Sequence, residues 1–277
     1  MSADLTTAAT EARLPSALSL GLARTGLEVK EFFRQRDSFI FTFAFPVILL
    51  FIFGSVFSDP IAPGVSFTQY FAAGMVASGV MLSSFQSLAI GIAIERDDGT
   101  LKRLRGTPMP LASYFLGKIG QVLVTSVIQM AILLTVGALV FGLKLPTDPA
   151  LWLRFVWVFV LGTTAGTILG IVYSSVPRSA SSASAVVSPV VLVLQFISGV
   201  FFVYSDLPGW MQTIGSFFPL KWLAQGMRSV FLPAEFEASE AAGSWQLPQM
   251  ALILALWSVV GLVLALRTFR WQRRDAG

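Results

Sequence analysis

Residues 69–94 read QYFAAGMVASGVMLSSFQSLAIGIAI, a stretch without a single Asp, Glu, Lys or Arg. A helix needs about 20 apolar residues to cross the roughly 30 Å hydrocarbon core of a bilayer. The stretch also lacks the alternation of lipid-facing and lumen-facing residues that marks a strand of a membrane β-barrel. It therefore predicts a membrane-spanning helix, and this decides the class of the fold.

Five further stretches are long, apolar and free of charged side chains. Together with the first they predict six membrane-spanning helices, over about residues 39–57, 69–94, 119–143, 155–176, 185–204 and 247–266. The composition agrees, since 55% of the 277 residues are hydrophobic, 12% are charged, and the mean hydropathy is +0.75. We expect an all-α integral membrane protein with six transmembrane helices.

The positive charges predict the orientation of these helices. Of the 19 Lys and Arg residues, 15 lie before the first span, in the second and fourth loops or after the last span, and the other loops hold four. Loops rich in Lys and Arg remain in the cytoplasm. Both termini are therefore predicted to be cytoplasmic, with a disordered N-terminal tail at residues 1–17 and a cytoplasmic tail at residues 271–277.

Two segments outside the spans are apolar enough to touch the membrane. Residues 18–37 mix Leu and Phe with charged residues, which predicts an interfacial helix, with a plain juxtamembrane anchor as the alternative. Residues 205–246 keep apolar side chains at helical spacing between prolines, which predicts short re-entrant helices before the sixth span. An interfacial aromatic belt is the alternative there, but it does not explain the length of the apolar run.

The composition excludes several kinds of site. The chain has no Cys and no His, so disulfides, thiol nucleophiles, His-based zinc sites and histidine general bases are excluded. The predicted spans carry no ionisable residue, which argues against a membrane enzyme or an ion-driven transporter. No G-x-x-x-x-G-K-[ST] motif is present to bind a nucleotide phosphate. We therefore predict no catalytic site, no metal site and no cofactor on this chain.

The most concentrated charged segment is the second loop, ERDDGTLKRLRGTPMP at residues 95–110. Asp98 or Thr100 can cap a helix start, and a proline ends the helix after about two turns. Leu101 and Leu104 fall on one side of it, opposite the charged side chains. The pattern predicts a short amphipathic helix that can dock against a partner, with a plain positive-inside anchor as the alternative.

Two motifs resemble those of one family. The second loop contains E-x-x-x-G-T-L-x-x-L-x-x-T-P from Glu95 to Pro108, followed by Gly-Lys at residues 117–118. This resembles the signature of ABC-2 type permeases, such as bacterial drug and lipid exporters of the daunorubicin-resistance kind. SGVFF at residues 198–202 and DLPGW at residues 206–210 are similar to the fifth span of that family and its return to the sixth.

The resemblance implies roles for particular residues. The second loop would be the coupling helix, which docks into a groove of a separate ATPase subunit, with Glu95 as the hinge to the second span. The residues implied in coupling are Glu95, Asp98, Gly99, Thr100, Leu101, Lys102, Arg103, Leu104, Arg105, Thr107 and Pro108. Substrate would pass between two protomers, and the candidates for lining its path, which are equally compatible with helix packing, are Phe85, Gln86, Gln195, Phe196 and Phe201.

The resemblance also implies a function for the whole chain. Residues 18–270 would be an ABC-2 type transmembrane domain in the bacterial inner, or plasma, membrane. It would act as the permease subunit of an ATP-binding-cassette exporter of a hydrophobic or amphiphilic molecule, drug-like or lipid-like. The expected partners are an ABC ATPase subunit, which would bind ATP and Mg²⁺, a second permease protomer in a homodimer rather than a heterodimer, and the lipid bilayer, with no nucleic acid.

Two other functions fit the sequence. A permease for a polysaccharide or a lipid-linked glycan would have a wider, aromatic-lined channel. A membrane assembly or sensor subunit would use the second loop to bind a partner without transporting anything. An ATPase gene next to the gene of this chain would count against the assembly or sensor role.

Overall fold

The computed structural model describes residues 16–57 and 59–269, and its regular structure is almost entirely helical. The elements in chain order are α1 (Ala17–Arg34), α2 (Arg36–Val56), β1 (Pro60–Ala62), β2 (Val65–Ser66), α3 (Phe67–Met81), the π-helical segment η1 (Leu82–Gln86), α4 (Ser87–Asp97), α5 (Thr100–Arg105), α6 (Leu111–Phe141), α7 (Pro149–Tyr173), α8 (Ala180–Ile197), η2 (Tyr204–Asp206), α9 (Gly209–Ser216), α10 (Pro219–Phe231), η3 (Ala234–Ser239) and α11 (Leu247–Thr268).

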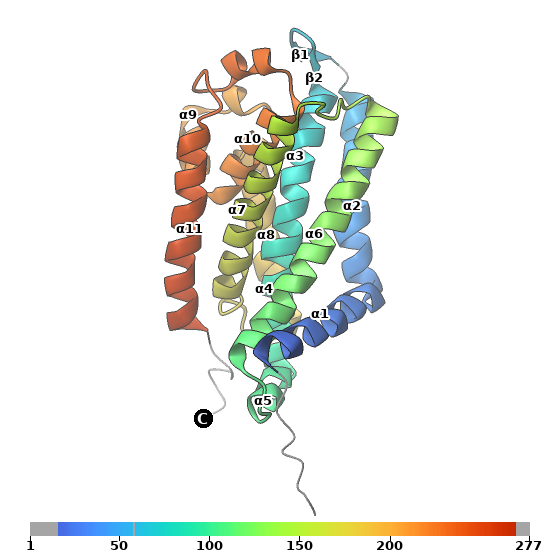
Figure 1. The fold of residues 1–277 in the computed structure, drawn as a ribbon. Helices are drawn as coiled ribbons and strands as arrows, with labels where there is room; N and C mark the ends of the chain where they lie inside the picture. Colours follow the sequence, from blue (N-terminus) through green and yellow to red (C-terminus); the bar gives the residue numbers. More distant parts are fainter. Residues whose placement is uncertain (1–15, 58, 270–277) are drawn as a thin grey trace, which may run out of the picture.

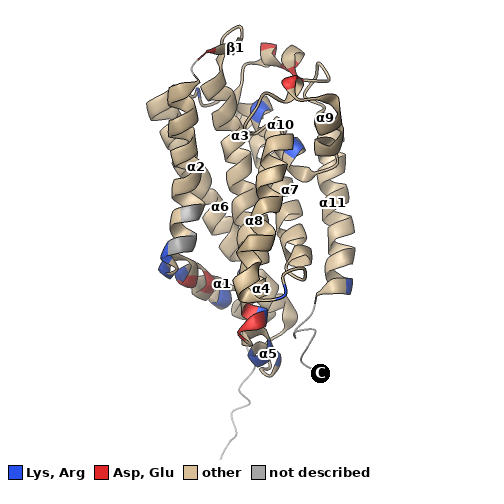
Figure 2. Ribbon diagram, turned by 180° about the vertical axis from the view of Figure 1, so that it is seen from behind, with Lys and Arg blue, Asp and Glu red and all other residues tan. Residues whose placement is uncertain are grey.

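The long helices form one bundle with two distinct ends (Figure 1). The α5 end carries α5 and α1, and α1 lies across the base of the bundle rather than along it. The hairpin end carries the β1–β2 hairpin and α9. Figure 2 shows that charged residues gather toward these two ends, whereas the long helices between them are almost free of charge. This charge distribution is that of a protein whose middle lies in hydrocarbon.

Five helices of the described chain are long and apolar enough to cross a membrane. They are Phe67–Asp97, Leu111–Phe141, Pro149–Tyr173, Ala180–Ile197 and Leu247–Thr268. The remaining predicted span corresponds to α2, in which the apolar segment Thr42–Val56 is shorter. The chain is therefore a multi-pass helical membrane protein, and the count of six spans stays a prediction.

The span Phe67–Asp97 lies at the centre of the bundle. In its most apolar window 72% of the residues are buried within the protein, against 22% for Leu247–Thr268. Its first half packs against α2, α6 and α10, and its second half packs against α7 and α8. The peripheral helices instead expose large apolar side chains such as Ile48, Leu139 and Leu252, which suits a surface covered by lipid.

The structure differs from the predicted elements in two places. The predicted fifth span, residues 185–204, is wrong in its last part, because α8 ends at Ile197 and the chain then turns through Gly199 at φ +72°. Hydropathy misses such a turn, because a buried turn is as apolar as a helix. The first loop forms a two-stranded antiparallel hairpin that the all-helical prediction omitted, since strands this short have no detectable alternation.

Other predicted boundaries agree more closely with the structure. α1 confirms a helix at residues 18–37, although it ends at Arg34, and α9 and α10 confirm helices between residues 205 and 246. The central span reaches Asp97, beyond the predicted limit at residue 94. Nearly all of the predicted N-terminal tail and the whole of the predicted C-terminal tail lie outside the described residues.

Helix α7 approaches the π-helical segment η1 so closely that it leaves no room for a side chain at Gly170. A Cβ atom there would lie 2.9 Å from the carbonyl oxygen of Phe85 and 3.0 Å from that of Ser84. Backbone atoms cannot rotate away from such a contact. We expect Gly170→Ala to lower the free energy of unfolding by about 1–3 kcal/mol through overpacking. Thermal unfolding of the purified protein in detergent, followed by tryptophan fluorescence, measures this change.

Gly91→Ala is the matched control for this substitution. Gly91 lies in α4, and a Cβ atom on it would have no neighbour within 4 Å. Ala is the better helix former, so the control should unfold at the wild-type temperature or slightly above it. Equal losses of stability in the two variants would contradict the close packing of α7 on η1.

Candidate functional site

The short helix α5 is defined by its flanking residues. Gly99, just before it, adopts φ +80°, a left-handed conformation that disfavours residues with a Cβ atom. The N-cap is therefore Gly99, not Asp98 or Thr100 as predicted, although Asp98 Oδ1 accepts a hydrogen bond at 2.8 Å from the backbone N–H of Thr100, the first helical residue. Thr107 Oγ1 donates to the carbonyl of Leu104 at 2.7 Å and closes the other end. A helix of about two turns in the second loop is confirmed.

The two leucines of α5 face this chain rather than a partner. Leu101 is fully buried in a cluster that includes Ile92 and Tyr114, and Leu104 packs against the same cluster. The apolar face predicted for docking is therefore used to fix α5 to its own bundle, and Leu101 is not accessible to another protein. The predicted coupling residues that remain exposed on and after α5 are Lys102, Arg103, Arg105, Thr107 and Pro108.

Glu95 belongs to a buried charged cluster just above α5, formed by Arg24, Glu28, Glu95 and Lys118. Lys118 Nζ lies 2.7 Å from Glu95 Oε1 and 2.7 Å from Glu28 Oε2. Arg24 Nη2 lies 2.6 Å from Glu28 Oε1 and 3.4 Å from Glu95 Oε1. Tyr114 donates its hydroxyl proton to Glu95 Oε2 at 2.7 Å. The cluster thus joins α1, α4 and α6.

The charges within this cluster balance, since it contains two cations and two carboxylates. Lys118 and Glu28 are almost completely buried, and buried charges are tolerated only when they are paired and hydrogen-bonded. Such a cluster holds its helices in one relative position, because separating them would leave charges without partners. It can therefore fix the base of α5.

The two residues after Glu95 reach two further helices. Arg96 donates from Nη1 to the carbonyl of Ser174 and from Nη2 to that of Pro177, both at 2.7 Å, at the end of α7. Asp97 Oδ2 accepts from the backbone N–H of Ala180 at 2.8 Å, at the start of α8. Three consecutive residues therefore connect the end of α4 to α1, α6, α7 and α8.

Close backbone contact between α1 and α6 completes this arrangement. A Cβ atom on Gly117 would collide with Arg24, and one on Gly120 would collide with Thr25. The two glycines let α1 lie directly on α6, which brings Arg24 and Glu28 within reach of Lys118. The base of the bundle is thus a single packed unit around the start of α5.

Sequence reasoning singled out Glu95 and, by resemblance, Lys118, but it missed their partners. Arg24 and Glu28 are four residues apart, and Glu28 shares the buried face of α1 with Gly21 and Phe32. Gly21, Glu28 and Phe32 stand at i, i+7 and i+11, a spacing that places them on one face of a helix. This spacing could have indicated that the carboxylate of Glu28 points into the protein.

The five predicted substrate-path residues differ in their burial and contacts. Phe85 is buried against Tyr173, and Gln86 is half-buried beside it in η1. Gln195 is buried and donates from Nε2 to Ser78 Oγ at 2.6 Å, as expected of a helix-packing amide. Phe201 is buried, whereas Phe196 is 40% exposed, and their ring centroids are 4.9 Å apart.

Comparison with known proteins supplies the family. The sequence profile described as ABC-2 type transporter matches residues 23–232, more than half of the chain. The chain belongs to the ABC-2 type transporter family. A Bacillus subtilis (strain 168) protein named "Putative transport permease YvfS" is 21% identical over 196 residues, which cover 69% of this chain and 77% of that protein.

The part of the chain that matches the family includes the geometry around α5. The matched residues contain all of α5, the charged cluster and the contacts of Arg96 and Asp97. An ABC-2 permease is the membrane component of a transporter, and the family implies an ATP-binding partner subunit. A short helix that projects from one end of an ABC-2 permease, and is fixed at its base, is the natural place to look for contact with that subunit.

Proposed function

We propose that this ABC-2 permease moves a hydrophobic or amphiphilic molecule, drug-like or lipid-like, out of the cell with ATP hydrolysed by a separate ATPase subunit. The observation that supports it most is the construction of α5. Its outer surface carries Lys102, Arg103 and Arg105, all exposed, while its base is connected through Glu95, Arg96 and Asp97 to four other helices.

Such a construction suits the transmission of force. A displacement of α5 would act on α4, because Leu101 of α5 and Ile92 of α4 are buried in the same cluster. The charged cluster resists separation of α4 from α1 and α6, so these helices move together. Closure of an ATPase dimer against α5 would then shift several spans at once rather than bend one loop.

The charge distribution supports the orientation that this function requires. In the proposed arrangement α2 is the first of six spans, both termini are cytoplasmic, and the α5 end faces the ATPase in the inner membrane of a bacterium. ATP and Mg²⁺ belong to the ATPase subunit. A homodimer of this chain would place two α5 helices on the same side of the membrane, one for each ATPase.

The apolar character of the spans supports the proposed class of cargo. No Asp, Glu, Lys or Arg lies in the central segment at residues 69–94, and a conduit without charged groups suits an apolar or amphiphilic molecule. Of the five path candidates, Phe196 is the one with a large exposed aromatic face, and Phe202 beside it is also exposed. We assign the cargo path to this face of α8, between two protomers.

Reversal of the charges on α5 tests the proposal. We expect the triple variant Lys102→Glu, Arg103→Glu and Arg105→Glu to lose at least about tenfold in ATPase subunit recovered with the permease, because repulsion replaces complementary charge. Export of a fluorescent amphiphile from proteoliposomes with ATP should fall in parallel. The melting temperature should stay near that of the wild type, since the three side chains are exposed.

A second triple variant controls for net charge. Lys30→Glu, Arg34→Glu and Arg36→Glu reverses three exposed cations on or next to α1, away from α5. It should retain the ATPase subunit and transport. Full ATPase recovery and transport in the α5 variant would exclude coupling through this helix, and ATPase binding without transport of any amphiphile would favour the assembly or sensor role.

A further inference from the structure

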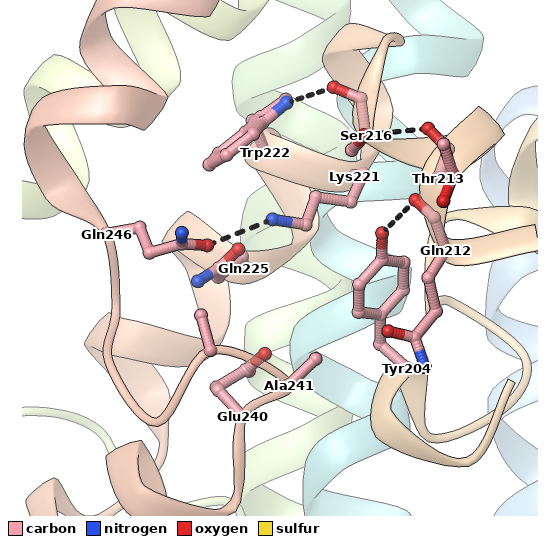
Figure 3. A pocket seen from close by; sticks show the side chains of 11 residues that line it. Tyr204, Gln212, Thr213, Ser216, Lys221, Trp222, Gln225, Glu240, Ala241 and Gln246 are labelled. Atoms are coloured by element: carbon pink, nitrogen blue, oxygen red, sulfur yellow. Dashed lines mark hydrogen bonds between the residues drawn. The ribbon is translucent and has the colours of Figure 1, made fainter. Parts of the chain in front are cut away.

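A pocket of about 400 Å³ lies at the hairpin end, among η2, α9, α10 and the segment before α11 (Figure 3). Its rim includes the exposed residues Thr213, Ala241 and Ala242. Deeper in the pocket lie two polar side chains of α10, Lys221 and Gln225, which are 4% and 1% exposed. They are four residues apart on one helix and therefore share a face.

Lys221 has no carboxylate partner among the described residues. Its Nζ lies 3.5 Å from Gln246 Oε1, a long contact for a hydrogen bond. The ammonium group otherwise lies over aromatic rings, 3.5 Å from the ring centroid of Trp222 and 5.3 Å from that of Tyr204. A buried ammonium without a counter-ion is unfavourable, so the pocket is set up for an anion.

The carboxylate of Glu240 also lines the pocket, but Arg228 already neutralises it. Arg228 Nε lies 2.6 Å from Glu240 Oε1, and its Nη2 lies 3.1 Å from Oε2, a bidentate ion pair that is fully buried. The charges around the pocket therefore sum to one positive charge, that of Lys221. A ligand with a single negative charge would balance it.

Gln225 indicates a second property of the ligand, a group that can donate a hydrogen bond. Its Nε2 donates to the backbone carbonyls of Ser244 and Trp245, at 3.2 and 3.0 Å. Its Oε1 is buried and accepts no hydrogen bond within the described chain. A buried acceptor without a donor is unfavourable, and a ligand hydroxyl group would supply the missing hydrogen bond.

We propose that this pocket binds a singly charged oxyanion with a neighbouring hydroxyl group, the chemistry of a glycerol phosphodiester. The oxyanion would bind Lys221 and the hydroxyl group would donate to Gln225 Oε1. Such a group is present in phosphatidylglycerol and in its soluble, deacylated form, glycerophosphoglycerol. The inference stands on the pocket alone and does not depend on the cargo or direction of transport proposed above.

The pH dependence of binding follows from the state of Lys221. Burial, together with the charge of Arg228, lowers the pKa of Lys221 to about 8. Only the protonated amine attracts the anion, so binding should weaken as pH rises above about 8, by up to about tenfold between pH 7 and pH 9. The other charged groups that face it are Arg228 and Glu240, which remain paired, and burial raises the pKa of Tyr204 to about 12.

Lipid retention by the full-length permease tests this site. The purified protein in detergent is mixed with equal amounts of phosphatidylglycerol and phosphatidylcholine, and bound lipid is measured by native mass spectrometry. We expect wild type to prefer phosphatidylglycerol by at least about tenfold and Lys221→Met to lose that preference, as expected when a desolvated charge pair is removed. Lys221→Arg should keep it, and Gln225→Met should reduce it about fivefold.

The matched control is Lys144→Met, which removes an exposed lysine just after α6 at the same end of the bundle. It should leave the preference unchanged. Titration with glycerophosphoglycerol distinguishes the two sources of the ligand. If glycerophosphoglycerol binds to wild type but not to Lys221→Met, the headgroup alone is sufficient for the site. If phosphatidylglycerol binds and glycerophosphoglycerol does not, the ligand is a membrane lipid. The proposal is overturned if wild type shows no preference or if Lys221→Met retains it.

Discussion

Replacing Lys118 with Met is expected to lower the free energy of unfolding by about 3–5 kcal/mol, the cost of leaving a buried ion pair without one partner. Lys118 Nζ is 2.7 Å from carboxylate oxygens of both Glu28 and Glu95. After the substitution, Arg24 alone would face two buried carboxylates. Because the lost contacts hold α1 and α4 to α6, we expect ATP-dependent transport to be lost as well. Thermal unfolding in detergent and transport in proteoliposomes measure the two effects.

Two variants separate charge balance from packing in this cluster. Lys30→Met removes an exposed lysine on α1 and should change neither property measurably. Lys118→Met combined with Glu28→Gln restores electrical neutrality around Arg24 and Glu95, so it should be more stable than Lys118→Met alone. If the double variant were less stable than the single one, the unpaired charge of Glu28 would not be the source of the stability lost in Lys118→Met.

Replacing Arg228 with Met should be comparably damaging at the hairpin end. Arg228 is fully buried, binds both carboxylate oxygens of Glu240 and donates from Nη1 to the carbonyl of Gly199 at 3.2 Å. Its removal leaves Glu240 charged and buried, which costs about 3–5 kcal/mol. It also removes support from the turn that follows α8. The melting temperature should fall clearly, and the tryptophan emission of the hairpin end should shift to the red as water enters.

The double variant Arg228→Met with Glu240→Gln is the decisive comparison. It removes both charges, so a large part of the stability lost in Arg228→Met should return. Arg154→Met is the control, since Arg154 is partly exposed and donates one hydrogen bond, to the carbonyl of Ser229. A double variant as unstable as Arg228→Met would mean that the guanidinium group acts mainly through Gly199 and the neighbouring rings.

The parts of the fold that the sequence predicted are those that depend on local pattern. Apolar length alone located the spans, because hydrocarbon imposes a minimum length on every crossing helix. The bounds of α5 could also be predicted, because they depend on residues next to it in the sequence. Asp98 and Gly99 before the helix and a proline after it are typical signals of a short helix. The orientation predicted from Lys and Arg remains a prediction.

The parts that could not be predicted depend on residues far apart in the chain. Glu28 and Lys118 are 90 positions apart, and nothing in either segment indicates that α1 crosses α6. Leu101 was interpreted as a docking residue because an apolar side chain on a short helix has the same pattern whether its partner is another protein or its own bundle. That choice requires the tertiary structure.

The polar residues on one face of α10 could be predicted in part. Lys221, Gln225 and Arg228 recur at i, i+4 and i+7, which places them on one face of a helix. In the sequence analysis Lys221 and Arg228 entered only as two of the positive charges in the loops between spans. Their burial could not be deduced, because it depends on α3 and α7, which pack against α10.

The five-residue π segment divides the central span into two arms of unequal length. It separates an arm of 15 residues, α3, from an arm of 11 residues, α4, which correspond to lengths of about 22 Å and 16 Å. The backbone of Ser84 and Phe85 is held against Gly170 at this point, which makes it the fulcrum. Because Arg96 holds the end of α4 to the end of α7, a tilt about this point would have to break these bonds, and it would then move the α3 tip about 1.4 times as far as the α4 tip.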